Sequence, residues 1–400
     1  ETAGEHFTPR EVIRLMVNIL FLNDRDVLTK KGITKTIYDC CAGTGGMLSV
    51  AEEYLHDLNP DARLEMFGQE LNPESYAICK SDMLIKGQNA SNIKKGNSIS
   101  EDHLSNLKFD YLITNPPFGV KWEKYAKKVK DEHEQLGHGG RFGAGLPAMT
   151  DGSFLFLMHL MSKMKPEGSR LAIVFNGSPL FSGSPSSKKN ESSIRQWIIE
   201  NDMLEAIIAL PNQLFYNTGI STYNWIITNK KPKARKGKVQ LINAVDFFKK
   251  MSKSLGDKRN ELSDEHITEI TRLYGEFRES EYCKIFDNKE FGYSKVTVER
   301  PERNSKGEIV KDKNGKPKAD SSLRDTENIP LKEDIQEYFK REVLPHVPDA
   351  WIDESKTNIG YEINFTKYFY KYKPLRSLEQ IRADILALEQ ETDGLMNEVL

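Results

Sequence analysis

The most constraining feature of this 400-residue sequence is a short apolar run that ends in two prolines. The run 109–114 has the composition of a buried strand, and it stops at Asn115. Pro116 and Pro117 have no amide hydrogen, so the strand cannot continue through them, and Asn115 is biased to an extended backbone because it precedes a proline. The sequence therefore predicts a stiff corner that presents the Asn115 amide, the Pro116 carbonyl and the Phe118 ring.

Such a corner suits a flat base that carries an exocyclic amino group. The Asn115 side-chain oxygen and the Pro116 carbonyl can each accept one hydrogen of an NH2 group. When both hydrogens are held aside, the nitrogen lone pair leaves ring conjugation and can attack an electrophile. The Phe118 ring can stack on the base. The same residues also fit an ordinary strand followed by a Pro-Pro turn, so the motif alone is a hypothesis.

A second feature is a strand, a glycine-rich turn and a helix in immediate succession. The strand 37–39 ends at Asp39, and we expect a helix over 47–55. The turn between them contains Ala42, Gly43, Thr44, Gly45 and Gly46. This order is typical of a nucleotide-type cradle, because glycines let the backbone approach a ligand closely. It matches neither a Walker loop nor Gly-x-Gly-x-x-Gly, and a merely structural turn is the alternative.

Two polar residues after later strands extend the predicted cofactor site. A strand over 64–68 leads to Glu70, about one βαβ unit after the glycines, where an acidic side chain can bind both ribose hydroxyls. A solvated carboxylate at a strand end is the other interpretation of Glu70. Asn97 follows a short strand and can contact the edge of an adenine ring. Asp39 could hold a cationic amino group.

The start of the chain predicts a covered helix N-terminus. The run 8–11 (Thr-Pro-Arg-Glu) reads as a capping box with proline at the first helical position. An aromatic pair, His6 and Phe7, precedes it and can cover a ligand. Because the sequence begins with Glu1 and enters this motif at once, we expect a fragment whose natural N-terminal part is missing.

Strands and helices alternate through the following part of the chain. We expect helices over 154–164 and 191–200 and strands over 171–175, 204–210, 223–228 and 239–244. This order predicts an α/β fold with a mostly parallel sheet covered on both faces. The stretch 120–149 is polar and contains five glycines, so we expect a long loop that orders on substrate binding.

Composition limits the possible partners and locations. The 57 basic and 59 acidic residues leave no global positive field, so nucleic-acid contacts must come from local patches or a partner. Two basic segments, 230–238 and 249–259, could meet phosphates, although solvated surface is the commoner reason for such runs. The four cysteines show neither disulfide nor zinc spacing, and no apolar run reaches the roughly 18 residues of a membrane span. We therefore expect a cytoplasmic protein without metal or membrane contact.

The last third of the chain has two patterns of its own. Residues 299–327 are polar and predict an exposed hairpin or a disordered insertion. Apolar residues recur at steps of three and four over 378–399, which is a heptad seam that requires a partner helix. We expect a catalytic domain over 1–275, an extension packed on it over 276–370, and an amphipathic helix over 371–400.

Three motifs in this order resemble those of amino-group DNA methyltransferases. They are the runs 4–10 (Gly-Glu-His-Phe-Thr-Pro-Arg), 39–48 (Asp-Cys-Cys-Ala-Gly-Thr-Gly-Gly-Met-Leu) and 115–118 (Asn-Pro-Pro-Phe). More narrowly, the chain is similar to the modification (M) subunit of type I restriction–modification systems, through 172–181, 207–228 and 291–301 to the terminal helix. The resemblance implies a Rossmann-like, seven-stranded mixed sheet with helices on both faces and a C-terminal helical extension. It also implies a helical N-terminal domain that this chain lacks.

The same resemblance implies S-adenosyl-L-methionine as cofactor and N6 of adenine as the methylated atom. The implied partners are double-stranded DNA, a specificity (S) subunit that docks on the terminal helix, a second M subunit and a restriction (R) subunit. The catalytic residues would be Asn115, Pro116, Pro117 and Phe118. The cofactor would be held by Glu5, His6, Phe7, Thr8, Pro9, Arg10, Asp39, Ala42, Gly43, Thr44, Gly45, Gly46, Glu70 and Asn97.

Two features of the sequence depart from the usual pattern of this family. Cys40 and Cys41 precede Ala42 where the family usually has Pro-Ala-Cys, and Asn97 stands where many methyltransferases carry Asp. A neutral amide at position 97 can still hydrogen-bond an adenine. Two alternatives stay open at this point: a protein glutamine N-methyltransferase, since an amide amine can use the same corner, and a non-catalytic subunit that binds the cofactor and assembles a complex.

Overall fold

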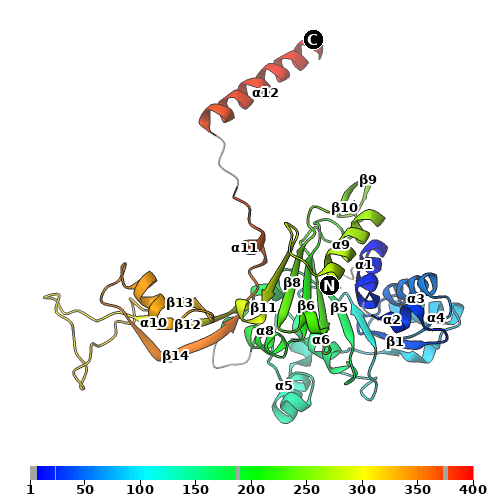
Figure 1. Cartoon of the computed structure of the whole chain (residues 1–400), viewed down its shortest axis with the longest axis horizontal. Helices are drawn as coiled ribbons and strands as arrows, with labels where there is room; N and C mark the ends of the chain where they lie inside the picture. The colour runs from blue at the N-terminus through cyan, green and yellow to red at the C-terminus, as the bar shows by residue number, and fades with distance from the viewer. Residues whose placement is uncertain (1–6, 23, 186–189, 373–376, 400) are drawn as a thin grey trace. The chain divides into compact units, whose positions relative to one another are not determined.

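The computed structural model describes residues 7–22, 24–185, 190–372 and 377–399. The chain divides into two compact units, Glu1–Phe365 and Thr366–Leu400. The larger unit contains a nine-stranded sheet, and the smaller contains one long helix, α12 (Leu378–Val399) (Figure 1). None of the helices in the described part of the chain is long and apolar enough to cross a bilayer.

The nine-stranded sheet has the order β11-β8-β6-β7-β5-β4-β1-β2-β3. Its strands are β1 (Thr34–Asp39), β2 (Arg63–Glu70), β3 (Ile93–Lys95), β4 (Tyr111–Thr114), β5 (Arg170–Phe175), β6 (Leu204–Ala209), β7 (Tyr223–Thr228), β8 (Lys238–Asn243) and β11 (Cys283–Asp287). The strands from β3 to β5 pair in parallel, whereas β7 runs antiparallel to both β5 and β6. The mixed sheet that the resemblance implied is therefore present, and the strand predicted over 239–244, β8, extends it together with β11 beyond the implied seven strands.

Helices cover both faces of this sheet. The longer ones are α1 (Arg10–Phe21), α3 (Gly46–Leu58), α4 (Pro73–Ile85), α6 (Ser153–Ser162), α8 (Glu191–Glu200) and α9 (Asp264–Glu276). One hydrophobic cluster joins α1, α3 and α9 to alternate residues of the central strands, such as Ala172 and Val174. On the other face, Phe154 of α6 contacts Phe175 and Trp225 edge to face. Because α6 is apolar on every side, it is buried along its length.

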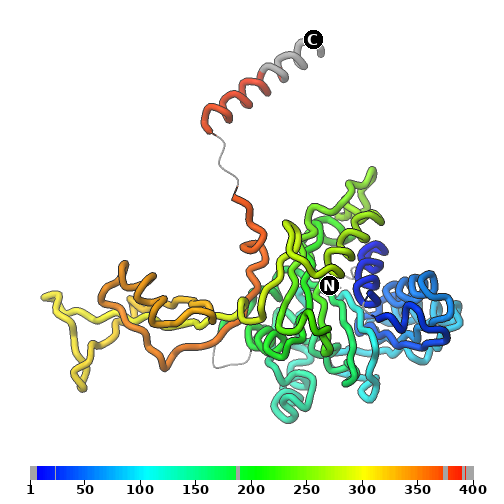
Figure 2. Tube along the Cα trace, viewed as in Figure 1, coloured from blue at the N-terminus to red at the C-terminus, as the bar shows by residue number. Residues whose placement is uncertain are grey.

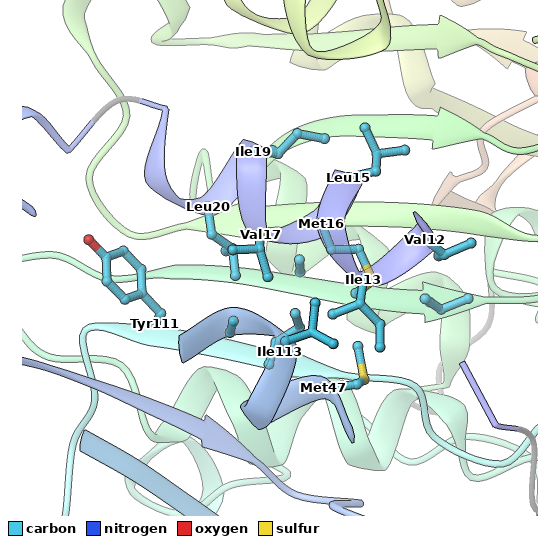
Figure 3. Packing of buried hydrophobic residues seen from close by; sticks show 14 of the residues in the cluster. Val12, Ile13, Leu15, Met16, Val17, Ile19, Leu20, Met47, Tyr111 and Ile113 are labelled. Atoms are coloured by element: carbon cyan, nitrogen blue, oxygen red, sulfur yellow. The ribbon is translucent and has the colours of Figure 1, made fainter. Parts of the chain in front are cut away.

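Helix α1 is held against the sheet by a continuous apolar face. Its buried side chains are Val12, Ile13, Leu15, Met16, Val17, Ile19, Leu20 and Phe21. They gather above Met47 at the start of α3 and Tyr111 and Ile113 of β4 (Figure 3). Burying a side chain of this kind contributes roughly 1.5–3 kcal/mol, so the N-terminal end of α1 has a fixed position relative to β4.

The stretch 120–149 is not the loop that the sequence predicted. It contains α5 (Ala126–Leu136), a helix in which only Val129 is buried. Most residues of this helix are charged or polar, so few apolar positions marked it in the sequence. Arg141 holds the segment after α5 against that helix, because its guanidinium forms an ion pair with Glu132 of α5 at 2.6 Å.

Two smaller β structures follow the central sheet, and Figure 2 traces the chain through them. The strands β9 (Lys249–Leu255) and β10 (Lys258–Glu261) form a hairpin. A three-stranded antiparallel sheet contains β12 (Gly292–Glu299), β13 (Asp325–Pro330) and β14 (Trp351–Tyr361). Tyr361 joins the last strand to α8, since its carbonyl accepts a 2.7 Å hydrogen bond from Arg195. Residues 300–324 are mostly exposed and pair only through isolated bridges, as in an irregular hairpin.

The remaining helices of the described residues are short. They are α2 (Arg25–Thr29), α7 (Ser178–Phe181), α10 (Ile335–Tyr338) and α11 (Phe365–Phe369). All four cysteines are free, and no three His, Cys, Asp or Glu side chains among the described residues are placed to share a metal ion.

Candidate active site

A cavity of about 510 Å³ opens at the carboxyl ends of β1, β2 and β4. Asp39 and Glu70 are the last residues of β1 and β2, and Asn115 directly follows β4. The cavity is lined by Phe7, Thr8, Ile13, Asp39, Cys40, Cys41, Ala42, Gly43, Thr44, Gly46, Met47, Glu70, Leu71, Asn72, Pro73, Ser75, Gly96, Asn97, Ser98, Asn115, Pro117, Val120 and Phe156. Parallel strands place their carboxyl ends at one edge, which is where open α/β sheets bind ligands.

Asp39 brings a buried carboxylate to this cavity. Its side chain is 1% exposed, and its Oδ1 accepts hydrogen bonds from the Cys41 amide at 2.9 Å and the Thr114 hydroxyl at 2.7 Å. Its Oδ2 is buried and has no partner among the described residues. Burial raises the pKa of Asp39 to about 7, against the two hydrogen bonds that lower it, and the nearby Glu70 charge raises it further. A cationic group in the cavity would supply the partner that Oδ2 lacks.

The glycine turn has the backbone that only glycine adopts easily. Gly43 and Gly45 have φ angles of +53° and +87°, and Gly45 is the N-cap of α3. A Cβ at Gly45 would lie 2.9 Å from Cys79 Sγ, so this residue packs against α4 and does not line the cavity. The position of the turn is thus fixed by the packing of Gly45 against α4 and by the hydrogen bond from the Gly43 amide to Glu70.

Glu70 binds the glycine turn through its carboxylate. Its Oε2 accepts a hydrogen bond from the Gly43 amide and its Oε1 accepts one from the Asn72 amide, both at 2.7 Å. Each carboxylate oxygen can accept more than one hydrogen bond. Glu70 can therefore brace the loops on both sides of the cavity and still accept from a ligand hydroxyl.

Asn97 uses its amide oxygen within its own loop. The Asn97 Oδ1 accepts hydrogen bonds from the amides of Ile99 at 2.9 Å and Ser100 at 3.2 Å. Its NH2 group is the part of the side chain that can still contact a ligand, and an NH2 group is a donor. An aspartate at this position would offer an acceptor instead, so Asn97 suits a ring nitrogen rather than an exocyclic amine.

Arg141 is a residue of this site that the sequence analysis missed. Its guanidinium donates to the carbonyls of Ser98 at 2.8 Å and Ile99 at 3.0 Å, and it is 14% exposed. Ser98 in turn donates to the Cys40 carbonyl at 2.6 Å. Arg141 therefore joins the stretch after α5 to the loop around Asn97. In the sequence, only its place within a glycine-rich stretch sets Arg141 apart from other surface arginines.

The Asn115 corner adjoins the same cavity. Asn115 is 9% exposed, its Nδ2 donates to the Thr8 hydroxyl at 2.9 Å, and its Oδ1 is buried without a partner in the described part of the chain. Pro117 also lines the cavity. Pro116 is buried and is not part of the cavity wall, and Phe118 is half-buried against the main hydrophobic cluster.

The N-terminal segment approaches Asn115 from the other side. Phe7 is 61% exposed and lines the cavity together with Thr8, whereas Arg10 lines a neighbouring hollow that Tyr216 shares. The predicted capping box is wrong: the N-cap of α1 is Pro9, without a side-chain cap, because the Thr8 hydroxyl contacts Asn115 instead. The predicted site residues Glu5 and His6 lie outside the described residues.

The structure thus brings most of the predicted site residues to one cavity. Those that line it are Phe7, Thr8, Asp39, Ala42, Gly43, Thr44, Gly46, Glu70, Asn97, Asn115 and Pro117. Apart from the unplaced Glu5 and His6, the other predicted residues stand beside it: Pro9, Arg10, Gly45, Pro116 and Phe118. Val120 and Phe156 add apolar side chains to the wall of the cavity, and no motif in the sequence indicated them.

The family model described as N-6 DNA Methylase matches residues 1–305. The chain belongs to this family. It is 31% identical over 297 residues to the type I restriction enzyme MjaIX methylase subunit of Methanocaldococcus jannaschii, a match that covers 74% of this chain and 49% of that protein. It is 27% identical over 294 residues to the EcoKI methylase subunit of Escherichia coli, covering 68% of this chain and 50% of that one.

A solved structure of a type I restriction–modification system methyltransferase subunit from Streptococcus thermophilus has the same fold. The TM-score is 0.60 at 27% identity, over 73% of this chain and 57% of that chain. The family membership and this structure agree with the predicted resemblance to type I M subunits. The chain spans about half the length of the curated relatives it matches.

Proposed function

We propose that this chain is the catalytic part of a type I modification subunit that methylates adenine at N6 in DNA with S-adenosylmethionine. One observation carries the proposal: Asp39 Oδ2 and Asn115 Oδ1 are buried acceptors without partners in the part of the chain that the structure describes, and both residues line the same cavity. The first is a carboxylate oxygen that suits a cation, and the second is an amide oxygen that suits an amine. A buried acceptor without a partner costs about 1–3 kcal/mol, so ligands that fill both places are stabilised there.

The residues present fit S-adenosylmethionine. When bound, this cofactor supplies a sulfonium methyl group with a good leaving group. Asp39 would hold the ammonium of its methionine part, and the backbone of 43–46 would lie against the same part. Glu70 would accept from the ribose hydroxyls while it keeps its bonds to Gly43 and Asn72. The Asn97 NH2 would donate to a ring nitrogen of the adenine.

The Asn115 corner would bind the target adenine after it leaves the duplex. Enzymes that act on a base inside DNA take it out of the stack. Asn115 Oδ1 and the Pro116 carbonyl would each accept one hydrogen of N6, so the lone pair points toward the methyl group. The Phe118 ring next to this corner would stack on the base. Such a reaction requires mostly positioning, and a corner fixed by two prolines provides it.

The partners follow from the same family. The charge of the whole chain is −2, so this chain has no general attraction for DNA. We infer that an S subunit supplies sequence recognition, that α12 docks on it, and that a second M subunit and an R subunit complete the assembly. The heptad pattern over 378–399 provides the apolar seam for that docking.

The decisive experiment measures transfer of labelled methyl groups to DNA by the full-length subunit purified with its S subunit. We expect label on N6 of adenine, and we expect Asn115→Ala to abolish transfer while calorimetry shows that S-adenosylmethionine still binds. Label on cytosine or on a protein glutamine would refute the proposal. So would near-wild-type transfer by Asn115→Ala.

A further inference from the structure

Thr8 contacts Asn115 although the two residues are 107 positions apart. The Asn115 carboxamide is planar, so the place of its Nδ2 decides the place of its Oδ1. Nδ2 donates to Thr8 Oγ1 at 2.9 Å, and Oδ1 is left without a protein partner in the described residues. The Thr8 hydroxyl accepts the bond from Nδ2, so in this arrangement Oδ1 is the end of the amide that remains for a ligand.

The backbone explains why the Thr8 hydroxyl is available. Pro9 has extended dihedrals of −59° and 141° and stands at the N-cap of α1, so Thr8 precedes the helix and does not cap it. Helix α1 in turn packs its whole apolar face on the cluster that includes Ile113 of β4. Thr8 and Asn115 are thus carried by two elements that are packed against each other, which fixes the distance between them.

We infer that Thr8 is a positioning residue that holds the Asn115 amide with its oxygen toward the substrate amine. This inference rests on the proposed function. A flipped amide would present an NH2 group to the adenine NH2, two donors facing each other, and the lone pair would not be freed. The family resemblance implies a cofactor-binding role for Thr8, and the two roles predict different kinetics.

The test compares Thr8→Val, Thr8→Ala and Thr8→Ser in the full-length subunit with its S subunit. Removing the hydroxyl deletes one part-buried hydrogen bond, so we expect kcat to fall roughly tenfold in the Val and Ala variants. The dissociation constant of S-adenosylmethionine, measured by calorimetry, should stay within about twofold. Thr8→Ser keeps a hydroxyl and should restore most of kcat.

Three results would overturn this inference. Unchanged kcat in both the Val and the Ala variant would show that the contact between Thr8 and Asn115 does not contribute to catalysis. A loss that appears only in cofactor affinity would return Thr8 to the cofactor site. A rise in kcat would show that the bond restrains the enzyme. Asn115→Ala in the same assay distinguishes failure of this inference from failure of the proposed function, because an active Asn115→Ala variant refutes the proposed function itself.

A second inference concerns the β9–β10 hairpin, which is anchored beside the cavity. The buried Lys258 ammonium pairs with Glu11 of α1 and donates to the Leu214 carbonyl at 3.0 Å. At the turn, the Asp257 amide donates to the Tyr216 carbonyl at 2.8 Å. Gly256 allows this approach, since a Cβ there would lie 2.5 Å from the same carbonyl oxygen.

The free surface of this hairpin is basic. Lys249, Lys250, Lys253 and Arg259 are exposed, and none of them has an ion-pair partner within 4.0 Å among the described residues. The turn of the hairpin touches Tyr216, which shares a hollow with Phe7 and Thr8. Exposed positive charge is therefore carried by a hairpin whose turn contacts a residue of the hollow beside the cavity.

We propose that the β9–β10 hairpin contacts backbone phosphates of the duplex that flanks the flipped adenine. This too rests on the proposed function. A duplex whose base reaches Asn115 must pass close to the cavity opening, and phosphates are the groups it would present to exposed lysines. Each phosphate that a lysine neutralises releases counterions and steepens the salt dependence of DNA binding.

The test replaces Lys249, Lys250 and Lys253 together by Gln in the complex with the S subunit. A matched control replaces Lys306, Lys311 and Lys313, which are exposed between β12 and β13, and changes the net charge equally. We expect the slope of log affinity against log salt to become shallower by about 2–3 for the hairpin triple only. An unchanged slope, or equal changes in both triples, would refute the hairpin contact. If the unmodified complex neither binds nor methylates DNA, the proposed function fails instead.

Discussion

Glu70 Oε2 accepts a 2.7 Å hydrogen bond from the backbone amide of Gly43, so the end of β2 holds the glycine turn that follows β1. This bond gives Glu70 a role even before a ligand binds. A carboxylate that accepts from two backbone amides fixes the shape of the cavity, and charge-assisted bonds of this kind are stronger than neutral ones.

Replacing Glu70 should therefore weaken cofactor binding in two ways. Glu70→Ala removes the brace on the turn and the acceptor for the ribose, and we expect S-adenosylmethionine affinity to fall by roughly 100-fold, since bonds to charged groups contribute about 1.5–3 kcal/mol. Calorimetry measures the change, with Asp57→Asn, exposed on α3, as the control. An affinity equal to that of the unmodified protein would rule out the ribose contact.

Asp39 should make cofactor binding depend on pH. The folded pKa is about 7, so below that pH the carboxyl is largely protonated and cannot attract an ammonium group. We expect the affinity for S-adenosylmethionine to rise as the pH increases from 6 to 8. Asp39→Asn can keep the bonds from Cys41 and Thr114 but has no charge, so it should bind weakly at every pH. Calorimetry across this range would contradict the assignment if both proteins gave the same profile.

The same group should affect the stability of the free protein. Its pKa is raised from 3.8 to about 7, so the folded state holds a proton that the unfolded state releases. The free energy of unfolding should fall as the pH rises from 4 through 7, by on the order of 4 kcal/mol for this group alone. Denaturant melts at pH 5 and pH 8 measure it. Asp39→Asn should remove most of the difference, and saturating cofactor should reduce it.

Local sequence rules predicted the elements that contribute residues to the cavity. Outside the cavity, the helix 191–200 and the strand 223–228 also have the predicted bounds. The Asn115 corner could be recognised because two adjacent prolines impose it on the backbone wherever they occur. What the sequence could not show were contacts between distant segments. The Thr8 hydroxyl bonds to Asn115 and not to its own helix, and no local pattern distinguishes these outcomes.

The edge strand β11 and the helix α5 were missed for a related reason. β11 joins β8 as an antiparallel neighbour, and its residues are only partly buried, so its pattern does not alternate clearly. α5 is a polar helix whose neighbour segment is held by Arg141. Both depend on partners elsewhere in the chain, which a single sequence does not reveal.

Arg141 should be important for stability and for the cofactor loop. Arg141→Ala leaves Glu132 without its partner and frees the carbonyls of Ser98 and Ile99, and we expect a loss of about 3 kcal/mol. Proteolysis should become faster within 120–149, and cofactor affinity should fall. The control is Arg272→Ala, which breaks exposed pairs on α9 and should cost at most about 1 kcal/mol. Equal losses of stability in the two variants would show that the Arg141 contacts contribute no more than the exposed ion pairs of Arg272.

Two adjacent glycines provide the sharpest test of the turn that precedes α3. Gly45 has a φ of +87°, and an added Cβ would lie 2.9 Å from Cys79 Sγ, whereas a Cβ at Gly46 meets nothing within 4 Å. Gly45→Ala should therefore destabilise the fold by about 1–3 kcal/mol and displace the turn, because a left-handed backbone and a clash coincide. Gly46→Ala introduces the same methyl group at the first residue of the helix and should leave the melting temperature unchanged or slightly higher. If Gly45→Ala melted like Gly46→Ala, then Cys79 and α4 would not fix the turn, and the shape of the cavity would have to depend on Glu70 alone.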